Sequence, residues 1–100
     1  MNVNVKYLFP IRKIVGRDCE TFEVNPNINV ANLVEEMALK YGEGFKEFMV
    51  SSESGKFTTG RVSIGIQREG VIGTKRIEFL NGFDTLLMNQ DVVLLYNPHA

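Results

Sequence analysis

The side chains that could do chemistry are few in this sequence. His99 is the only histidine among 100 residues. A hydrolase triad needs a histidine between a nucleophile and a carboxylate, and a two-histidine metal site needs a second histidine. His99 can build neither without residues from another chain, so we interpret it as a solvated tail residue. We therefore predict no catalytic residue, no metal site and no cofactor, and hence a protein that is not an enzyme by itself.

Acidic side chains are candidates for acid–base chemistry, but their positions favour structural roles. Asp84 precedes a threonine in a predicted turn, and Asp91 stands directly before an apolar run. Aspartates in such places commonly accept hydrogen bonds from nearby backbone amides. Glu35 and Glu36 fall on the polar side of a predicted helix. We therefore predict turn and capping roles for the two aspartates.

Cys19 is the only cysteine. A single cysteine excludes an intramolecular disulfide, a four-cysteine zinc site and a cysteine-ligated iron–sulfur cluster. It lies at the start of a predicted strand, where we expect a small, half-buried side chain.

Charge and hydropathy exclude several classes of partner. Eleven basic residues against 12 acidic ones leave a net charge of −1, so no broad electrostatic field favours nucleic acid or a membrane surface. Basic residues between 56 and 76 are expected to be solvated strand and hairpin positions; the alternative is that they meet an acidic partner. No apolar run approaches the roughly 20 residues that span a bilayer, and the N-terminus lacks the pattern of a signal peptide. We expect a cytoplasmic protein that acts on neither nucleic acid nor membranes.

The clearest element is a helix that begins after Asn29 and ends at Gly42. Asparagine is a good N-cap, and glycine readily takes the left-handed conformation that ends a helix. The apolar residues between them recur at helical spacing and form one stripe: Val30, Leu33, Val34, Met37 and Tyr41. We expect this stripe to pack on residues of the predicted strands: Val3, Val5, Val62, Ile64 and Val93.

Strands are predicted on both sides of this helix. Alternation of polar and apolar residues indicates strands at 2–9, 21–24, 61–67, 76–79 and 92–96. Short helical turns are expected over 11–15 and around 45–49, and a loop over 51–55. This order predicts an α+β protein, a single domain over 1–100. Its architecture would be a β-grasp, a mixed sheet of four to five strands packed on one main helix, with the first and last strands as central, parallel neighbours.

Three segments resemble the MoaD/ThiS family of ubiquitin-like sulfur carriers. Residues 9–16, FPIRKIVG, are similar to the family's opening strand and turn, and residues 29–37, NVANLVEEM, to the start of its helix. The most specific match is residues 80–96, LNGFDTLLMNQDVVLLY, which resemble the family's ending. Segments 43–60 and 68–75 are longer than in compact members. The resemblance implies a sulfur-carrier-type protein of molybdopterin, tungstopterin or thiamine biosynthesis, whose partner is an adenylating enzyme or a synthase subunit.

The C-terminal tail departs from that family. Its carriers end in Gly-Gly, which can pass a narrow channel to the nucleotide of the adenylating enzyme, whereas this sequence has Pro98-His99-Ala100. The resemblance implies that the terminal carboxylate becomes an acyl-adenylate and then a thiocarboxylate. Ala100 would add a methyl group at the reacting residue, and His99 a ring behind it. Three hypotheses stay open: an interaction or regulatory subunit without carrier chemistry, a natural protein that continues into the two glycines, and an alanine terminus that the enzyme accepts.

The same resemblance implies a partner-binding patch. Leu8, Leu80 and Tyr96 correspond to positions where sulfur carriers present apolar side chains to the adenylating enzyme or to the molybdopterin synthase large subunit. We expect them on the sheet face away from the helix, where apolar side chains fill no core and are available to a partner. The alternative is that all three belong to the rim of the core.

Overall fold

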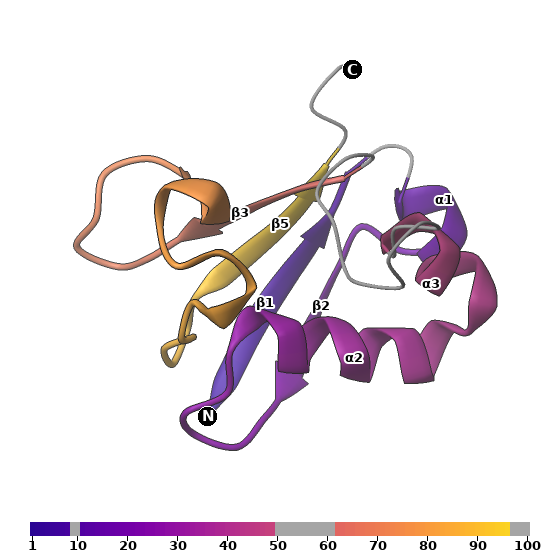
Figure 1. Cartoon of the computed structure of the whole chain (residues 1–100), viewed down its shortest axis with the longest axis horizontal. Helices are drawn as coiled ribbons and strands as arrows, with labels where there is room; N and C mark the ends of the chain where they lie inside the picture. Colours follow the sequence, from indigo (N-terminus) through magenta and orange to yellow (C-terminus); the bar gives the residue numbers. More distant parts are fainter. Residues whose placement is uncertain (9–10, 50–61, 97–100) are drawn as a thin grey trace.

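A five-stranded sheet with helices on one face forms the body of the protein (Figure 1). The computed structural model describes residues 1–8, 11–49 and 62–96. Its strands are β1 (Asn2–Tyr7), β2 (Cys19–Glu23), β3 (Ser63–Gln67), β4 (Lys75–Arg76) and β5 (Val92–Tyr96). Its helices are α1 (Ile11–Val15), α2 (Val30–Tyr41) and α3 (Glu43–Met49), with 3₁₀ turns η1 (Ile77–Phe79) and η2 (Gly82–Asp84).

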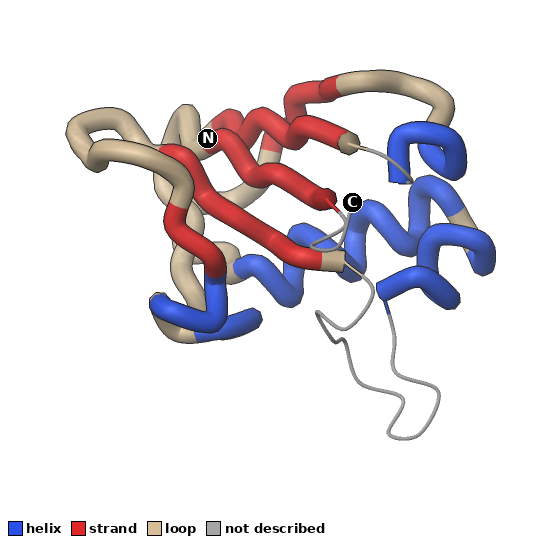
Figure 2. The backbone as a smooth tube through the Cα atoms, turned by 90° about the horizontal axis from the view of Figure 1, so that it is seen from above, coloured by secondary structure: helices blue, strands red, loops and turns tan. Residues whose placement is uncertain are grey.

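The strand order is β2-β1-β5-β3-β4. The first and last strands are neighbours and run parallel, with Val5 opposite Val93, while the other pairs are antiparallel. Seen from above, α1, α2 and α3 lie on one side of the sheet (Figure 2). We call that side the helix face and the other side the open face. The predicted α+β, β-grasp architecture is confirmed.

Helix α2 has the predicted ends. The Asn29 side chain accepts a hydrogen bond from the Asn32 amide at 2.8 Å, and the Asn32 side chain accepts one from the Asn29 amide at 3.1 Å. This reciprocal pair satisfies two amides that the first turn leaves without partners. At the other end Gly42 has a φ of 82°, and its amide donates to the Ala38 carbonyl. Local residue types therefore determine both ends of the helix.

The apolar stripe of α2 is buried in one core with the strands, as predicted. The stripe residues Val30, Leu33, Val34 and Met37 are buried, and Tyr41 is half-buried. The same cluster contains all five predicted strand partners: Val3, Val5, Val62, Ile64 and Val93. Helix α3 adds Phe45 and Met49 to this core.

Two local predictions are wrong. The strand predicted at 76–79 pairs with β3 only through Lys75–Arg76, and the chain then turns into η1. The turn points Ile77 into the core and closes with a hydrogen bond from the Leu80 amide to the Ile77 carbonyl. Cys19 is exposed rather than half-buried, because it lies opposite Lys6 on the open face of edge strand β2. The loop predicted at 51–55 lies outside the described residues.

Candidate interaction surface

Leu8 and Tyr96 lie side by side on the open face. The Leu8 amide donates to the Leu95 carbonyl at 2.9 Å, which continues the parallel register of Tyr7 with Leu95 by one residue. Because side chains alternate along a strand, Leu8 and Tyr96 both point away from α2. Leu8 is 41% exposed, and Tyr96 is half-buried. The structure therefore brings two of the three predicted patch residues together.

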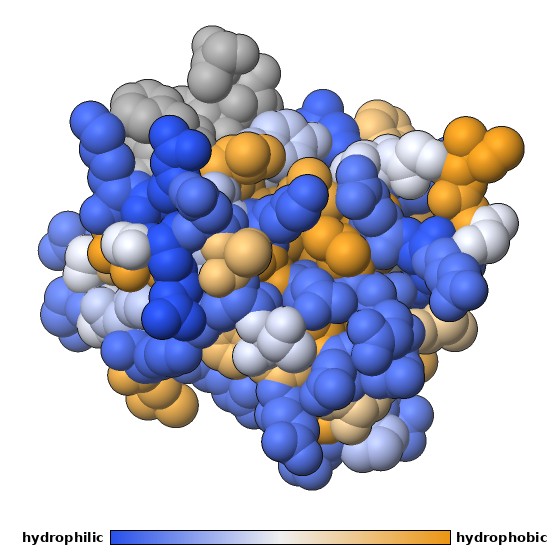
Figure 3. Space-filling view, turned by 180° about the vertical axis from the view of Figure 1, so that it is seen from behind, coloured by the Kyte–Doolittle hydropathy of each residue, from blue (hydrophilic) through white to orange (hydrophobic). Residues whose placement is uncertain are grey.

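These two residues belong to an apolar strip along the central strand. Val92, Leu94 and Tyr96 alternate on the open face of β5 and are half-buried. Leu8 extends the strip onto the end of β1. Figure 3 shows this side of the molecule, where areas of apolar surface lie among polar side chains. We call Leu8, Val92, Leu94 and Tyr96 the open-face strip; apolar side chains gathered on a surface make it a candidate protein-binding site.

Gly65 on β3 makes room beside the strip. A Cβ atom at Gly65 would lie 3.6 Å from Tyr96 Cε1 and 2.5 Å from Thr74 Cγ2. The missing side chain therefore lets the Tyr96 ring and the hairpin residue Thr74 both pack on the β3 backbone. The side-chain amide of Gln67 also donates to the Thr74 hydroxyl, from Nε2 to Oγ1, at 2.9 Å. A glycine inside a strand is the sequence signal for such a close approach.

Leu80 lies elsewhere. It follows η1 beyond the β4 edge and is 45% exposed. It lines a hollow of about 430 Å³, which we call the hairpin hollow. The lining residues of the hairpin hollow are Ile66, Arg68, Val71, Lys75, Phe79 and Leu80.

Glu20 collects a cluster of polar side chains that sequence reasoning missed. Its carboxylate accepts hydrogen bonds from Tyr7 Oη at 2.6 Å and Lys40 Nζ at 2.6 Å, and also from Tyr41 Oη. Arg17 Nη1 lies 3.1 Å away on the exposed side. The Glu20 side chain is only 5% exposed. The cluster thus ties β1, β2 and the end of α2 together between the sheet and the helix.

The charge on Glu20 is strongly stabilised. Burial alone would raise its pKa, but the hydrogen bonds from Lys40, Tyr41 and Tyr7 outweigh burial and lower the pKa to about 2. Burial, together with the hydrogen bond to Glu20, raises the pKa of Tyr7 and of Tyr41 above the usual tyrosine value. A general acid or base works best with a pKa near neutrality. These groups titrate far from it, so the cluster holds the fold together rather than moving protons.

Asp91 has the predicted turn role and an ion pair that was not predicted. It accepts a hydrogen bond from the Met88 amide at 2.8 Å. Both of its carboxylate oxygens also accept from Arg68, at 2.9 and 2.8 Å, so Arg68 is not the solvated residue we expected. Asp91 is 1% exposed, and the paired carboxylate raises the pKa of the Arg68 guanidinium.

The predicted turn role of Asp84 is not seen. Asp84 is exposed, and the Thr85 hydroxyl holds this turn by accepting from the Asn81 amide at 3.0 Å and donating to the Gly82 carbonyl at 2.7 Å. Glu35 and Glu36 are exposed on α2, as expected.

The tail residues Pro98, His99 and Ala100 lie outside the described residues, so their role stays a prediction. Within residues 1–8, 11–49 and 62–96, no three His, Cys, Asp or Glu side chains are grouped so that they could hold a metal ion. In the same ranges no helix has the length and apolar character needed to cross a membrane.

Comparison with known proteins shows the same fold in solved structures. A putative molybdopterin converting factor, subunit 1, from Pyrococcus furiosus is 27% identical with a TM-score of 0.71, covering 98% of both chains. Small archaeal modifier protein 1 from Methanosarcina acetivorans is 22% identical with a TM-score of 0.75, covering 97% of this chain and 92% of that one. No family model matches the sequence, and no curated protein matches it.

A third neighbour was solved with a protein partner. CysO in the Amycolatopsis orientalis BexX/CysO complex is 16% identical with a TM-score of 0.66, covering 95% of this chain and 93% of that one. The structural neighbours are thus β-grasp proteins of the MoaD, SAMP and CysO kind, which confirms the resemblance found in the sequence. They are small carrier or modifier proteins.

Proposed function

We propose that this chain is a ubiquitin-like carrier-type protein that acts by contact with a larger protein. The partner would be an adenylating enzyme or a synthase subunit, and the pathway molybdopterin, tungstopterin or thiamine biosynthesis. The observation that carries the proposal is the open-face strip, in which Leu8 is 41% exposed and which lies on the side of the sheet that α1, α2 and α3 leave uncovered. It is supported by the 27% identity to the putative molybdopterin converting factor subunit over nearly the whole chain.

The proposed contact is centred on Tyr96 and Leu8. Tyr96 offers an aromatic ring beside Gly65, and aromatic side chains give a large contact area at a low cost in conformational entropy. Lys6 lies beside Leu94 in the register of the sheet, so a cation borders the strip. A partner with an apolar centre and an acidic rim would fit this surface. The neighbour solved as a complex with BexX supports a protein as the partner.

A subunit of the same fold without carrier chemistry is the second candidate. Both candidates use the same surface, so binding does not separate them. They differ in whether the C-terminal carboxylate is activated by ATP.

Calorimetric titration against an adenylating enzyme of the family tests the contact. Tyr96→Ala should weaken binding about tenfold or more, because a central aromatic often carries about 2 kcal/mol of binding free energy. Leu86→Ala is the matched control, since Leu86 is 57% exposed and lies outside the strip. Both variants should keep a cooperative thermal transition. If Tyr96→Ala unfolds the protein and Leu8→Ala binds as well as the unaltered chain, the strip belongs to the core rim and the contact is wrong.

A further inference from the structure

Exposed apolar side chains concentrate at the β3–β4 end of the molecule. Nine large apolar side chains of the described residues are exposed, and four of them fall between residues 71 and 80. Ile72 is 93% exposed and Phe79 is 79% exposed, beside Val71 and Leu80. Single exposed apolar residues are ordinary, but such a grouping around a hollow marks an interaction surface.

The hairpin hollow carries a positive charge. Arg68 is neutralised by Asp91, at 2.8 Å. Lys75, the other cation that lines the hollow, forms no ion pair within the described part of the chain. The surface therefore combines apolar side chains with one unpaired ammonium group.

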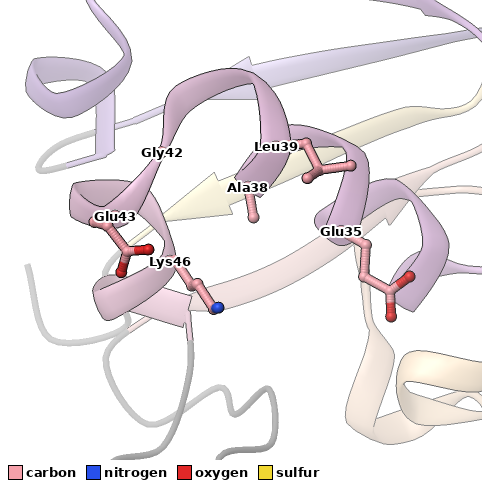
Figure 4. A pocket seen from close by; sticks show the side chains of 6 residues that line it. All are labelled: Glu35, Ala38, Leu39, Gly42, Glu43 and Lys46. Atoms are coloured by element: carbon pink, nitrogen blue, oxygen red, sulfur yellow. The ribbon is translucent and has the colours of Figure 1, made fainter.

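A second hollow, of about 370 Å³, lies between α2 and α3 (Figure 4). Leu39 stands beside it and is 88% exposed, while Ala38 forms part of its wall. Glu35 and Glu43 lie on either side, with Lys46 next to Glu43. Neither glutamate forms an ion pair among the residues that the structure describes. Among the residues that the structure describes, the rim of this helix hollow therefore carries two carboxylates and one ammonium group, a net negative charge.

The hairpin end and the helix hollow are complementary in charge, but they cannot meet within one chain. The β3–β4 hairpin and the α2–α3 junction lie at opposite ends of the molecule (Figure 1). We propose that the hairpin end of one copy docks on the helix hollow of a second copy. Ile72 enters the helix hollow, and Lys75 faces Glu35 and Glu43. The open-face strip takes no part, so this contact is independent of the proposed function.

The contact is heterologous, because two different surfaces meet. Such a contact repeats from copy to copy and gives a ring where the rotation between copies closes and an open chain where it does not. A net charge of −1 opposes association only weakly. Each surface is small, which predicts weak association that is visible at high protein concentration and reduced by salt.

Sedimentation velocity with a pair of charge-reversed variants tests the proposal. Lys75→Glu gives a chain with two acidic surfaces, and Glu35→Lys with Glu43→Lys gives a chain with two basic surfaces. Neither variant alone should associate, whereas an equimolar mixture should associate like the unaltered protein. Glu23→Lys is the control, since Glu23 is exposed on β2, away from both hollows. Circular dichroism melts show whether each variant is folded.

The expected result is a sedimentation coefficient that rises with concentration for the unaltered protein and for the mixture. Ile72→Glu should abolish this rise, because it places a carboxylate against the acidic helix hollow. If the unaltered protein stays a monomer into the millimolar range, the proposal is overturned. It is also overturned if the folded variants associate as well singly as in the mixture.

Discussion

Arg68 holds the buried carboxylate of Asp91 with two parallel hydrogen bonds, although 23 residues separate them. Arg68 directly follows β3, and Asp91 directly precedes β5. The same guanidinium donates to the Leu86 carbonyl at 3.1 Å. The pair therefore joins the ends of two antiparallel neighbours to the loop that leads into the central strand.

Arg68→Ala should destabilise the fold by about 3–5 kcal/mol, because the buried Asp91 carboxylate would lose its countercharge. Urea unfolding measures this. The matched control is Arg76→Ala, which breaks the more exposed pair with Glu78 and should cost about 0–1 kcal/mol. Equal losses in the two variants would mean that Asp91 finds water or another partner in place of Arg68.

The low pKa of Glu20 predicts that the stability of the fold depends on pH in the acidic range. Its pKa is about 2 in the folded protein against an ordinary value of 4.5, so its contribution to stability is fully present above about pH 4.5. As the pH falls toward about 2 the unfolded chain binds this proton first, and stability is lost. Glu20→Gln should be less stable than the unaltered protein at neutral pH and should lack this part of the acid loss. Urea midpoints measured across this range would refute the assignment if both proteins lost stability in parallel.

Gly65→Ala should destabilise the protein by about 1–3 kcal/mol, since overpacking forces neighbours to move. The added methyl group would meet Thr74 Cγ2 at 2.5 Å. Thr74→Ser removes that methyl group and keeps the hydroxyl that accepts from Gln67. The double variant should therefore recover most of the loss in thermal melts. Failure of Thr74→Ser to recover any stability would place the strain at the Tyr96 ring instead.

Elements with local signals were predictable from the sequence. Asn29 and Gly42 mark the ends of α2 because capping depends on residues within one turn. The apolar stripe of α2 must be buried against another element, and the alternating segments predict that this element is a sheet. Alternation along β5 likewise predicts that Tyr96 faces away from the buried Leu95.

Features that depend on distant residues were not predictable. Glu20 meets Tyr7 and Tyr41 only because β1, β2 and α2 come together, over separations of 13 and 21 residues. The pairing of Arg68 with Asp91 has the same origin. Leu80 was placed in the patch by resemblance alone, and the early end of β4 leaves it beyond the sheet edge. The type of a residue thus indicates whether its role is polar or apolar, whereas the topology of the fold determines which distant residues it contacts.

Carrier chemistry should depend on the residues at the C-terminus. In the presence of ATP and an adenylating enzyme of the family, a chain that ends in Pro98-His99-Ala100 should release no pyrophosphate. The same chain extended by Gly-Gly should release it, because two residues without side chains can pass a narrow channel and adopt open dihedral angles. Extension by Ala-Ala is the matched control for length. Pyrophosphate should then be released from the Gly-Gly version and not from the Ala-Ala version, although both have the same length.

Affinities for the adenylating enzyme, measured for the same three versions, separate access of the tail to the channel from recognition of the open-face strip. All three versions should bind the adenylating enzyme with similar affinity, because the open-face strip is unchanged in each. Tyr96→Ala in the Gly-Gly version should lower pyrophosphate release at limiting enzyme, since the tail would be presented less often. Equal release from the Ala-Ala and Gly-Gly versions would show that methyl groups do not obstruct the channel. The carrier and non-carrier candidates would then have to be separated by the partner rather than by the tail.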